Sequence, residues 1–178
     1  RSTNYITSGV WQIILNPTRV VEGQYDLWLP SENVLNRGTG FLYPDEEVTL
    51  TIPSTAEKVI SVGAYDALTF SYASFSGRGY TWQDERTKPD LVAPGVNVKT
   101  TAVGGGVTVV SGTSFATPFV TGASALLMEW GIVRGNDPFL YGEKVKAYLR
   151  RGARELPGFG RYPNREVGYG EDVIIRLH

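Results

Sequence analysis

The stretch VVSGTSFATPFVTGASALL, residues 109–127, decides the fold of this chain because it joins a strand to a helix through one tight turn. Two valines end an apolar run, Gly112 lets the backbone turn without a Cβ clash, and small residues then follow as in a closely packed helix. Ser114 is therefore predicted at or beside the N-terminus of a helix that covers about residues 114–130. Pro118 is expected in its first turn, where a missing N–H costs no hydrogen bond.

The composition excludes several classes of function. The chain of 178 residues has a net charge of −1 and no cysteine, which excludes disulfides, zinc–thiolate sites and thiol catalysis. There is no basic excess to indicate nucleic-acid binding, and no apolar run approaches the roughly 20 residues of a membrane span. The only histidine is His178, at the terminus. Because the chain begins at Arg1 and its only methionine is Met128, we expect a processed product whose targeting segment is not visible.

Residues 1–52 have the alternating pattern of β-strands. Apolar and aromatic side chains alternate with polar ones in GVWQIILNP, GQYDLWLP and EEVTLTIP, and turn residues separate these segments. We expect three short strands of an antiparallel sandwich with one solvated face. Trp11, Tyr25 and Trp28 are expected in its core, with a carbohydrate-binding platform as the alternative.

From residue 53 onward strands alternate with helices, which favours an α/β fold. The segments KVISVGAYD (58–66), KPDLVAPG (88–95) and VTVVSG (107–112) are short apolar runs typical of buried strands.

A second helix is predicted after the one that begins near Ser114. Gly131 is a typical C-terminal stop, and Asp137 with Pro138 has the pattern of an N-cap and a first-turn proline. This second helix is expected to turn four side chains toward the core: Leu140, Val145, Tyr148 and Leu149.

The position of Ser114 allows two interpretations. A hydroxyl at a helix N-terminus lies beside free N–H groups and the positive end of the helix dipole, so it can act as a nucleophile whose own amide helps to hold an oxyanion. The alternative is that Thr113 or Ser114 only caps the helix, which is the commoner use of such residues.

Longer segments resemble the subtilisin-like serine proteases. GTSFATP (112–118), with the small-residue helix after it, is similar to the signature around that family's catalytic serine. Four further segments occur in the family's order. VISVGAYD resembles the strand before the substrate pocket, and YASFSGRG resembles the ASFSS-x-G loop. KPDLVAPGVNVKTT resembles the PDLVAPG segment, and EKVKAYLRRGA resembles the helix that closes the domain. The resemblance covers about residues 53–170 and implies that Ser114 is the nucleophile of the C-terminal half of a parallel-sheet protease domain.

Within that family, the N-terminal residues are similar to the spore-germination (Csp-type) group, whose protease domain contains an inserted jelly roll. The resemblance implies that residues 1–52 are the last strands of the inserted sandwich and that 53–178 are the C-terminal part of the catalytic domain. It also implies a secreted or spore-associated location.

The family's other catalytic groups have no counterpart here. Its triad runs in the chain order Asp, His, Ser, and an Asn side chain completes the oxyanion hole. The chain has no Asp-Ser/Thr-Gly, His-Gly-Thr or Ala-x-Gly-Asn motif. We therefore expect the aspartate and histidine to come from an N-terminal part, and the 178-residue chain to be nearly inactive by itself.

The resemblance also implies further binding residues. Thr51–Thr55, around Pro53, correspond to one wall of the primary specificity pocket, and Ile52–Pro53 is a candidate cis peptide bond. Gly112, Thr113 and Ser111 are expected to line the oxyanion and leaving-group side through their backbone. No cofactor is expected; a structural calcium ion at Asp84, Glu85 and Asp90 is the alternative to a solvated acidic loop.

The sequence thus predicts the C-terminal segment of a serine endopeptidase that acts on proteins or peptides through an acyl-enzyme. The alternatives are a non-catalytic regulatory member of the same family, or an interaction module built around the sandwich. Because half a domain exposes apolar surface, the chain is expected to associate with the missing N-terminal half or with itself. No nucleic-acid or membrane partner is expected.

Overall fold

The computed structural model describes residues 7–23, 25–30, 34–80 and 86–172. The chain divides into two compact units, 1–40 and 41–178. These compact units do not test the domain boundary predicted after residue 52, which stays a prediction. Residues 41–52 belong to the second unit, in which the amide and hydroxyl of Thr49 exchange hydrogen bonds of 3.0 Å with the backbone of Arg78.

The expected strands of residues 1–52 do not form among the residues described up to position 52. The aromatic residues expected in a sandwich core are exposed instead, by 68% for Trp11, 64% for Tyr25 and 49% for Trp28. An alternating segment becomes a strand only when a neighbouring strand satisfies its backbone and covers its apolar face. No such partner lies against these segments in the described part of the chain. The jelly-roll assignment of this unit stays a prediction.

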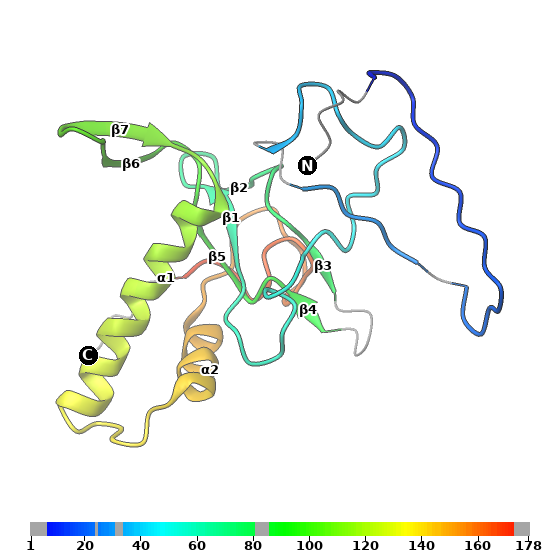
Figure 1. Ribbon diagram of the computed structural model, residues 1–178. Coiled ribbons are helices and arrows are strands. Elements are labelled where there is room, and N and C mark those ends of the chain that lie inside the picture. The colour runs from blue at the N-terminus through cyan, green and yellow to red at the C-terminus, as the bar shows by residue number, and fades with distance from the viewer. Residues whose placement is uncertain (1–6, 24, 31–33, 81–85, 173–178) are drawn as a thin grey trace. The chain divides into compact units, whose positions relative to one another are not determined.

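The second unit contains all the strands and helices of the described residues. Short loops connect most of them (Figure 1). In chain order they are β1 (Val62–Asp66), β2 (Ser71–Tyr72), β3 (Gly79–Tyr80), β4 (Thr87–Lys88), β5 (Leu91–Pro94), β6 (Val98–Thr101), β7 (Val107–Val110), α1 (Thr113–Met128), η2 (Glu129–Val133) and α2 (Gly142–Gly152).

The parallel pair β1 and β5 forms the centre of this unit. Val62 pairs with Leu91 and Tyr65 with Pro94, and β2 adds an antiparallel edge, so the sheet order is β2-β1-β5. Both central strands are apolar runs with buried residues pointing to either face, as parallel strands covered on both sides require. The predicted strands at 58–66 and 88–95 are confirmed, and so is the α/β class.

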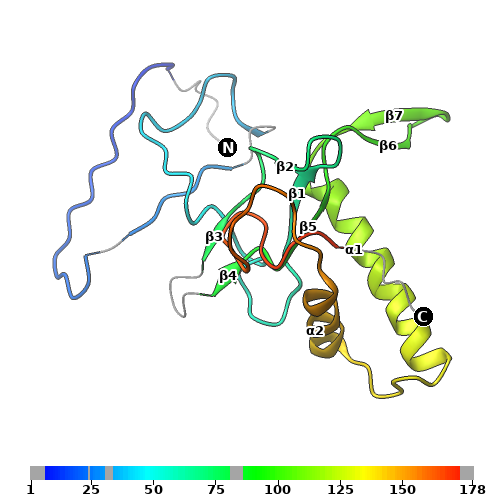
Figure 2. The ribbon, with the colours of Figure 1, turned by 180° about the vertical axis from the view of Figure 1, so that it is seen from behind.

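Two apolar layers cover the two faces of this sheet. Ala64, Leu91 and Ala93 pack with α1 and α2 on one face. The alternate residues Tyr65 and Val92 pack on the other face against Leu156 and Val167 from the segment after α2. This segment lies over β5 in the reverse view (Figure 2).

Helix α1 runs further than the sequence predicted. It passes directly into the π-helical turn η2, so Gly131 is not a stop but a buried residue packed against Leu140. A Cβ there would lie 2.9 Å from the Leu140 side chain, so close packing explains this glycine. By length and composition the helix Thr113–Val133 could cross a membrane. Its buried face, which includes Val120 and Leu127, packs on the sheet, as in the core helix of a globular domain.

The second helix begins later than predicted, at Gly142 rather than at Asp137. The Asp137 carboxylate accepts hydrogen bonds from Lys144 Nζ at 2.6 Å and Tyr148 Oη at 3.1 Å, so it contacts the side of α2 and does not cap it. The prediction of its inner face is confirmed, because Val145 and Leu149 are buried in the core.

Strands β6 and β7 form an antiparallel hairpin that extends away from the sheet (Figure 1). Its turn contains Gly104, Gly105 and Gly106, all with positive φ. The strand predicted at 107–112 is confirmed as β7, and the chain leaves it directly for α1.

Gly95 is the point of closest approach between the sheet and the start of α1. A Cβ at this residue would lie 2.5 Å from the Cβ of Ala64 and 3.4 Å from that of Ala116. We therefore expect Gly95→Ala to lower the free energy of unfolding by about 1–3 kcal/mol, because β1 and α1 must move apart. Chemical denaturation of the 178-residue chain measures this change.

Gly142→Ala is the matched control, because a Cβ at Gly142 has no neighbour within 4 Å. It should change stability by no more than about 0.5 kcal/mol. Equal unfolding midpoints for Gly95→Ala and the unmodified chain would contradict the packing described for this junction.

Candidate active site

Ser114 is the second residue of α1, directly after the turn that joins β7 to the helix. The N-cap is Gly112, with φ 152° and ψ 157°, a backbone conformation that favours glycine. No side chain caps this helix, so the capping role considered for Thr113 or Ser114 is not what these residues do. Ser114 itself is exposed.

The hydroxyls of Thr113 and Ser114, in the first turn of α1, differ from the three hydroxyls further along the helix. Those of Thr117, Thr121 and Ser124 donate to the carbonyl four residues earlier, at 3.0, 3.1 and 2.7 Å. For Ser114 the fourth residue back lies in β7, outside the helix. Within the described residues its hydroxyl has no hydrogen-bond partner, so it is free to react with or bind a ligand.

Pro118 modifies the same turn in a way that the sequence did not predict. It is the sixth residue of α1 and not part of its first turn. Because proline has no N–H, the Ser114 carbonyl has no helical donor four residues on. The amides of Thr113 and Ser114 also lack an acceptor among the described residues, which is ordinary for a first turn. Around the serine, these backbone groups thus have no hydrogen-bond partner among the described residues. The free amides of Thr113 and Ser114 lie at the positive end of the helix dipole, where an anion is favoured.

Two backbone hydrogen bonds place this turn at the carboxyl ends of β1 and β5. The amide of Gly112 donates to the Gly95 carbonyl at 2.8 Å, and the amide of Gly95 donates to the Tyr65 carbonyl at 3.0 Å. These bonds therefore link, in series, the end of β1, the residue after β5 and the start of α1. In open parallel sheets this edge is the usual position of a ligand site.

Ser111 has a structural contact as well as its predicted backbone role. Its hydroxyl accepts a hydrogen bond of 2.9 Å from the Asn97 amide, which ties together the two ends of the β6–β7 hairpin. The hairpin therefore holds the residue that precedes Gly112 in a fixed position.

Pro53 lies in a separate turn before β1. The Ile52–Pro53 bond is cis, as predicted. The amides of Ser54 and Ala56 close the turn by donating to Thr51 and Pro53 carbonyls at 2.8 and 3.0 Å. Its described contacts lead toward β1, and none of the hydrogen bonds among the described residues joins this turn to Ser114.

A buried charge cluster, which the sequence analysis missed, joins the segment before β5 to α2. We define it as Asp90, Lys88, Lys146 and Arg150. The Asp90 carboxylate is fully buried and accepts from Lys88 Nζ at 2.9 Å and from Arg150, and Lys146 Nζ lies 3.2 Å away. The spacing of Lys146 and Arg150 on one helix face, with the Lys-Pro-Asp triplet, was the available signal.

Electrostatics in the cluster follow from three cations around one carboxylate. Burial alone would raise the pKa of Asp90, but hydrogen bonds from the Ser61 amide, Lys88 and Arg150 outweigh it and lower that pKa. Burial lowers the pKa of Lys146 to about 8, and the attraction of Asp90 only partly opposes this. Asp90 is enclosed by cations in this structure, and the calcium ion considered from the sequence stays a prediction. Asp84 and Glu85 lie outside the described residues.

The base expected for a serine nucleophile is not found in the described part of the chain. His178 lies outside the described residues, and no described carboxylate contacts Ser114. Among the described residues, the site therefore consists of an exposed serine hydroxyl beside a turn of backbone donors, with no proton acceptor in contact with it.

Comparison with known proteins identifies the family. The model of the subtilase family of peptidases matches residues 42–170. The chain belongs to the subtilase family. It is 36% identical over 129 residues to the serine protease AprX of Bacillus subtilis (strain 168). The matched region covers 61% of this chain and 27% of AprX. It is also 36% identical to the human membrane-bound transcription factor site-1 protease, over 73% of this chain and 12% of that protein.

Among solved structures, the CspB protease of Clostridium perfringens is 50% identical, with a TM-score of 0.74 over 79% of this chain and 30% of that chain. The subtilase chain described here thus spans less than a third of each of these relatives. The resemblance read from the sequence is confirmed, including its similarity to a Csp protease.

The relatives' names do not support one location for all subtilases. A relative in Paenibacillus polymyxa is called an intracellular serine protease. The secreted or spore-associated location therefore stays a prediction for this subtilase.

The lowered pKa of Lys146 predicts a pH dependence of stability. Between about pH 8 and the usual lysine value of 10.5, the folded chain holds fewer protons at Lys146 than the unfolded chain does. The contribution of this residue to the free energy of unfolding therefore rises with pH in that window and is constant below it. Urea denaturation measures the free energy of unfolding of the unmodified chain and of Lys146→Met. Above pH 8 the value for the unmodified chain should rise relative to that for Lys146→Met.

Lys144→Met is the control on the same helix. The hydrogen bond to Asp137 raises the pKa of Lys144, so its contribution should instead fall as the pH rises past 10.5. The lowered pKa of Lys146 would be contradicted if the free energies of unfolding of Lys146→Met and the unmodified chain differed by the same amount from pH 7 to 10.5.

Proposed function

We propose that this subtilase is the C-terminal segment of a serine endopeptidase in which Ser114 is the nucleophile. The observation that carries the proposal is the free hydroxyl of Ser114 at the first turn of α1, beside amides that have no acceptor among the described residues. The serine would attack a peptide carbonyl and form an acyl-enzyme, and its own amide would donate to the oxyanion. Protein or peptide substrates follow from the family.

The remaining catalytic groups would come from a second segment. A serine hydroxyl needs a base to accept its proton, and subtilases use a histidine oriented by an aspartate. Loss of one triad member costs several orders of magnitude in rate. We therefore assign the histidine, the aspartate and the side-chain oxyanion donor to polypeptide outside residues 1–178. Gly112, Thr113 and Ser111 would line the leaving-group side, and the Pro53 turn would form a wall for the substrate side chain.

Labelling with a biotinylated fluorophosphonate tests this proposal. The probe should label Ser114 in a longer parent protein that contains these residues, and should leave the 178-residue chain almost unlabelled. Ser114→Ala should abolish labelling. Ser124→Ala is the matched control, because it removes a hydroxyl from the same helix that is occupied by the Val120 carbonyl.

A folded parent protein that contains the histidine and aspartate motifs but does not label would overturn the proposal. It would favour the non-catalytic regulatory alternative within the same family.

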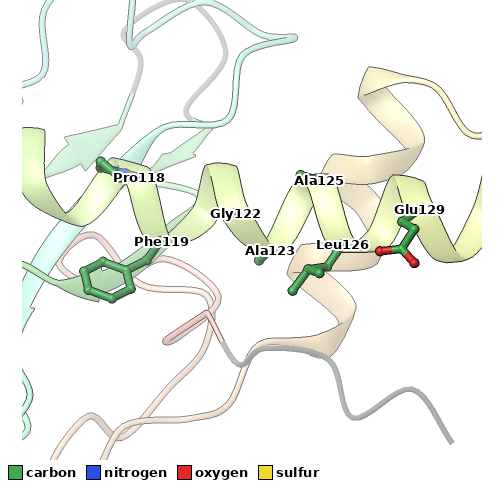
Figure 3. Close-up of a pocket in the computed structure, with 7 residues that line it drawn as sticks. All are labelled: Pro118, Phe119, Gly122, Ala123, Ala125, Leu126 and Glu129. Atoms are coloured by element: carbon green, nitrogen blue, oxygen red, sulfur yellow. The ribbon is translucent and has the colours of Figure 1, made fainter.

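The exposed side of α1 indicates where the second segment would bind. A shallow hollow runs along this helix, and Phe119 and Leu126 project from the same side of it (Figure 3). These side chains are 44% and 49% exposed, which is unusual for large apolar residues of a core helix. Pro118 and Gly122 also line the hollow and follow Ser114 at intervals of four, so the serine and the hollow share one face.

The occupant of this face would be the polypeptide that carries the base. More than two thirds of each relative's length lies outside the region matched by this subtilase, which is ample to cover the helix. A segment seated on the hollow would reach Ser114 because both lie on one helix face. The same burial would remove apolar surface from water and exclude water from the serine.

Charged substitutions on this face test the docking surface. Leu126→Glu should reduce association of the 178-residue chain with the separately expressed preceding part of the parent protein by at least tenfold, and should reduce Ser114 labelling in the mixture equally. Leu68→Glu is the control, because Leu68 is 83% exposed between β1 and β2 and does not line the hollow. Association is measured by sedimentation velocity.

A dimer of the 178-residue chain that Leu126→Glu dissociates, with no effect on association with the preceding part, would assign the face to a second copy instead. Unchanged association of Leu126→Glu would also overturn the assignment.

A further inference from the structure

The turn at Pro53 is joined to the buried charge cluster by a series of short contacts. The Ser54 hydroxyl lies 2.5 Å from the Ser61 hydroxyl, within one hydrogen bond. The Ser61 amide donates to the Asp90 carboxylate at 2.7 Å, and the Asp90 amide donates to the Ser61 carbonyl at 2.8 Å. A displacement at Asp90 is therefore passed through Ser61 to the turn.

Lys146 holds the same segment at two further points. Its Nζ donates to the carbonyls of Glu57 and Val59, both at 2.7 Å, and Lys88 Nζ donates to the Val59 carbonyl at 3.2 Å. Residues 57–61 form no regular strand before β1 begins at Val62, so these side-chain donors replace the backbone partners of a sheet.

Charge balance does not account for Lys146. Asp90 already accepts hydrogen bonds from Lys88, Arg150 and the Ser61 amide, and it carries a single negative charge. A third cation at 3.2 Å adds repulsion from the two others, and burial adds to its cost. What Lys146 alone supplies is the hydrogen bond to the Glu57 carbonyl, and it links Glu57 to the Val59 carbonyl, which Lys88 also contacts.

We propose that Lys146 is a positioning residue for the substrate-binding wall at Pro53. It fixes the backbone of residues 57–61 through two carbonyls, and Ser61 transmits this position to Ser54 in the turn. Lys146 does not contact Ser114 and has no part in the chemistry. This inference rests on the proposed function only in taking the Pro53 turn as a substrate wall.

Amide hydrogen exchange in the 178-residue chain tests the positioning directly. Lys146→Met should lower the protection of the Ser54, Ala56 and Ser61 amides at least tenfold, because the segment loses two of its anchors. Lys146→Arg, which can donate to both carbonyls, should restore most of this protection. Lys144→Met changes a lysine on the same helix that contacts Asp137 instead, and it should leave these amides unchanged.

Two results would overturn the inference. One is unchanged protection of these amides in Lys146→Met. The other is an equal loss across β1 and β5, which would mean that the variant lowers only global stability. If Lys146→Met does not fold, Lys146→Gln, which keeps a side-chain donor, is compared with Lys146→Arg in the same way.

Kinetics in an assembled protease separate this role from a structural one. Lys146→Met should raise KM about tenfold for peptides with a large side chain before the scissile bond, with kcat changed less than threefold. Lys146→Arg should return KM to near the original value. A fall in kcat as large as the rise in KM would contradict a positioning role. So would a rise in KM that Lys146→Arg does not reverse. Absence of Ser114 labelling would instead refute the proposed function, while the exchange result would still decide the role of Lys146.

Discussion

The buried carboxylate of Asp90 is the interaction on which the second unit depends. It connects the residue before β1, the end of β4 and the inner face of α2 through Ser61, Lys88 and Arg150. A charge that is fully removed from water is stable only when its partners stay in place. The carboxylate therefore fixes three segments that are far apart in the chain, and the parallel pairing of β1 with β5 is built directly beside it.

Helix α1 has two faces with different requirements. The inner face contains small and branched residues such as Ala116, Ala123 and Val120, which let the helix approach the sheet closely. Gly95 has the same function on the sheet side. The outer face exposes Phe119 and Leu126 to solvent. One short element thus contains the proposed nucleophile, the core contact and an exposed apolar surface.

The sequence predicted the elements whose signal is local. Buried strands appear as continuous apolar runs, and the turn at Gly112 is fixed by a residue that tolerates its φ. Among the described residues before residue 53 the expected strands are not formed, because alternation describes a strand only when a neighbour pairs with it. The start of α2 was misplaced because the Asp137 carboxylate binds side chains of that helix instead of its first amides.

The charge cluster could not be predicted from local pattern. Asp90 is separated by 29 residues from Ser61 and by 60 from Arg150, so only the fold brings these groups together. The position of Ser114 had the opposite character. Its neighbours in sequence define the turn, so the motif alone located this serine, whereas its freedom from local hydrogen bonds required the positions of the hydroxyls further along α1.

The parallel pairing of β1 with β5 also affects how the chain reaches this structure. The β6–β7 hairpin and α1 depend on contacts between residues close in sequence, whereas the two central strands meet only after the connection of residues 67–90 has closed. Closing such a connection costs chain entropy before any ladder hydrogen bond compensates for it. High contact order slows folding, so the hairpin and the serine-bearing helix are expected to form ahead of the sheet that supports them. During that interval both faces of α1 are open to solvent, and the time the chain spends there sets its exposure to aggregation.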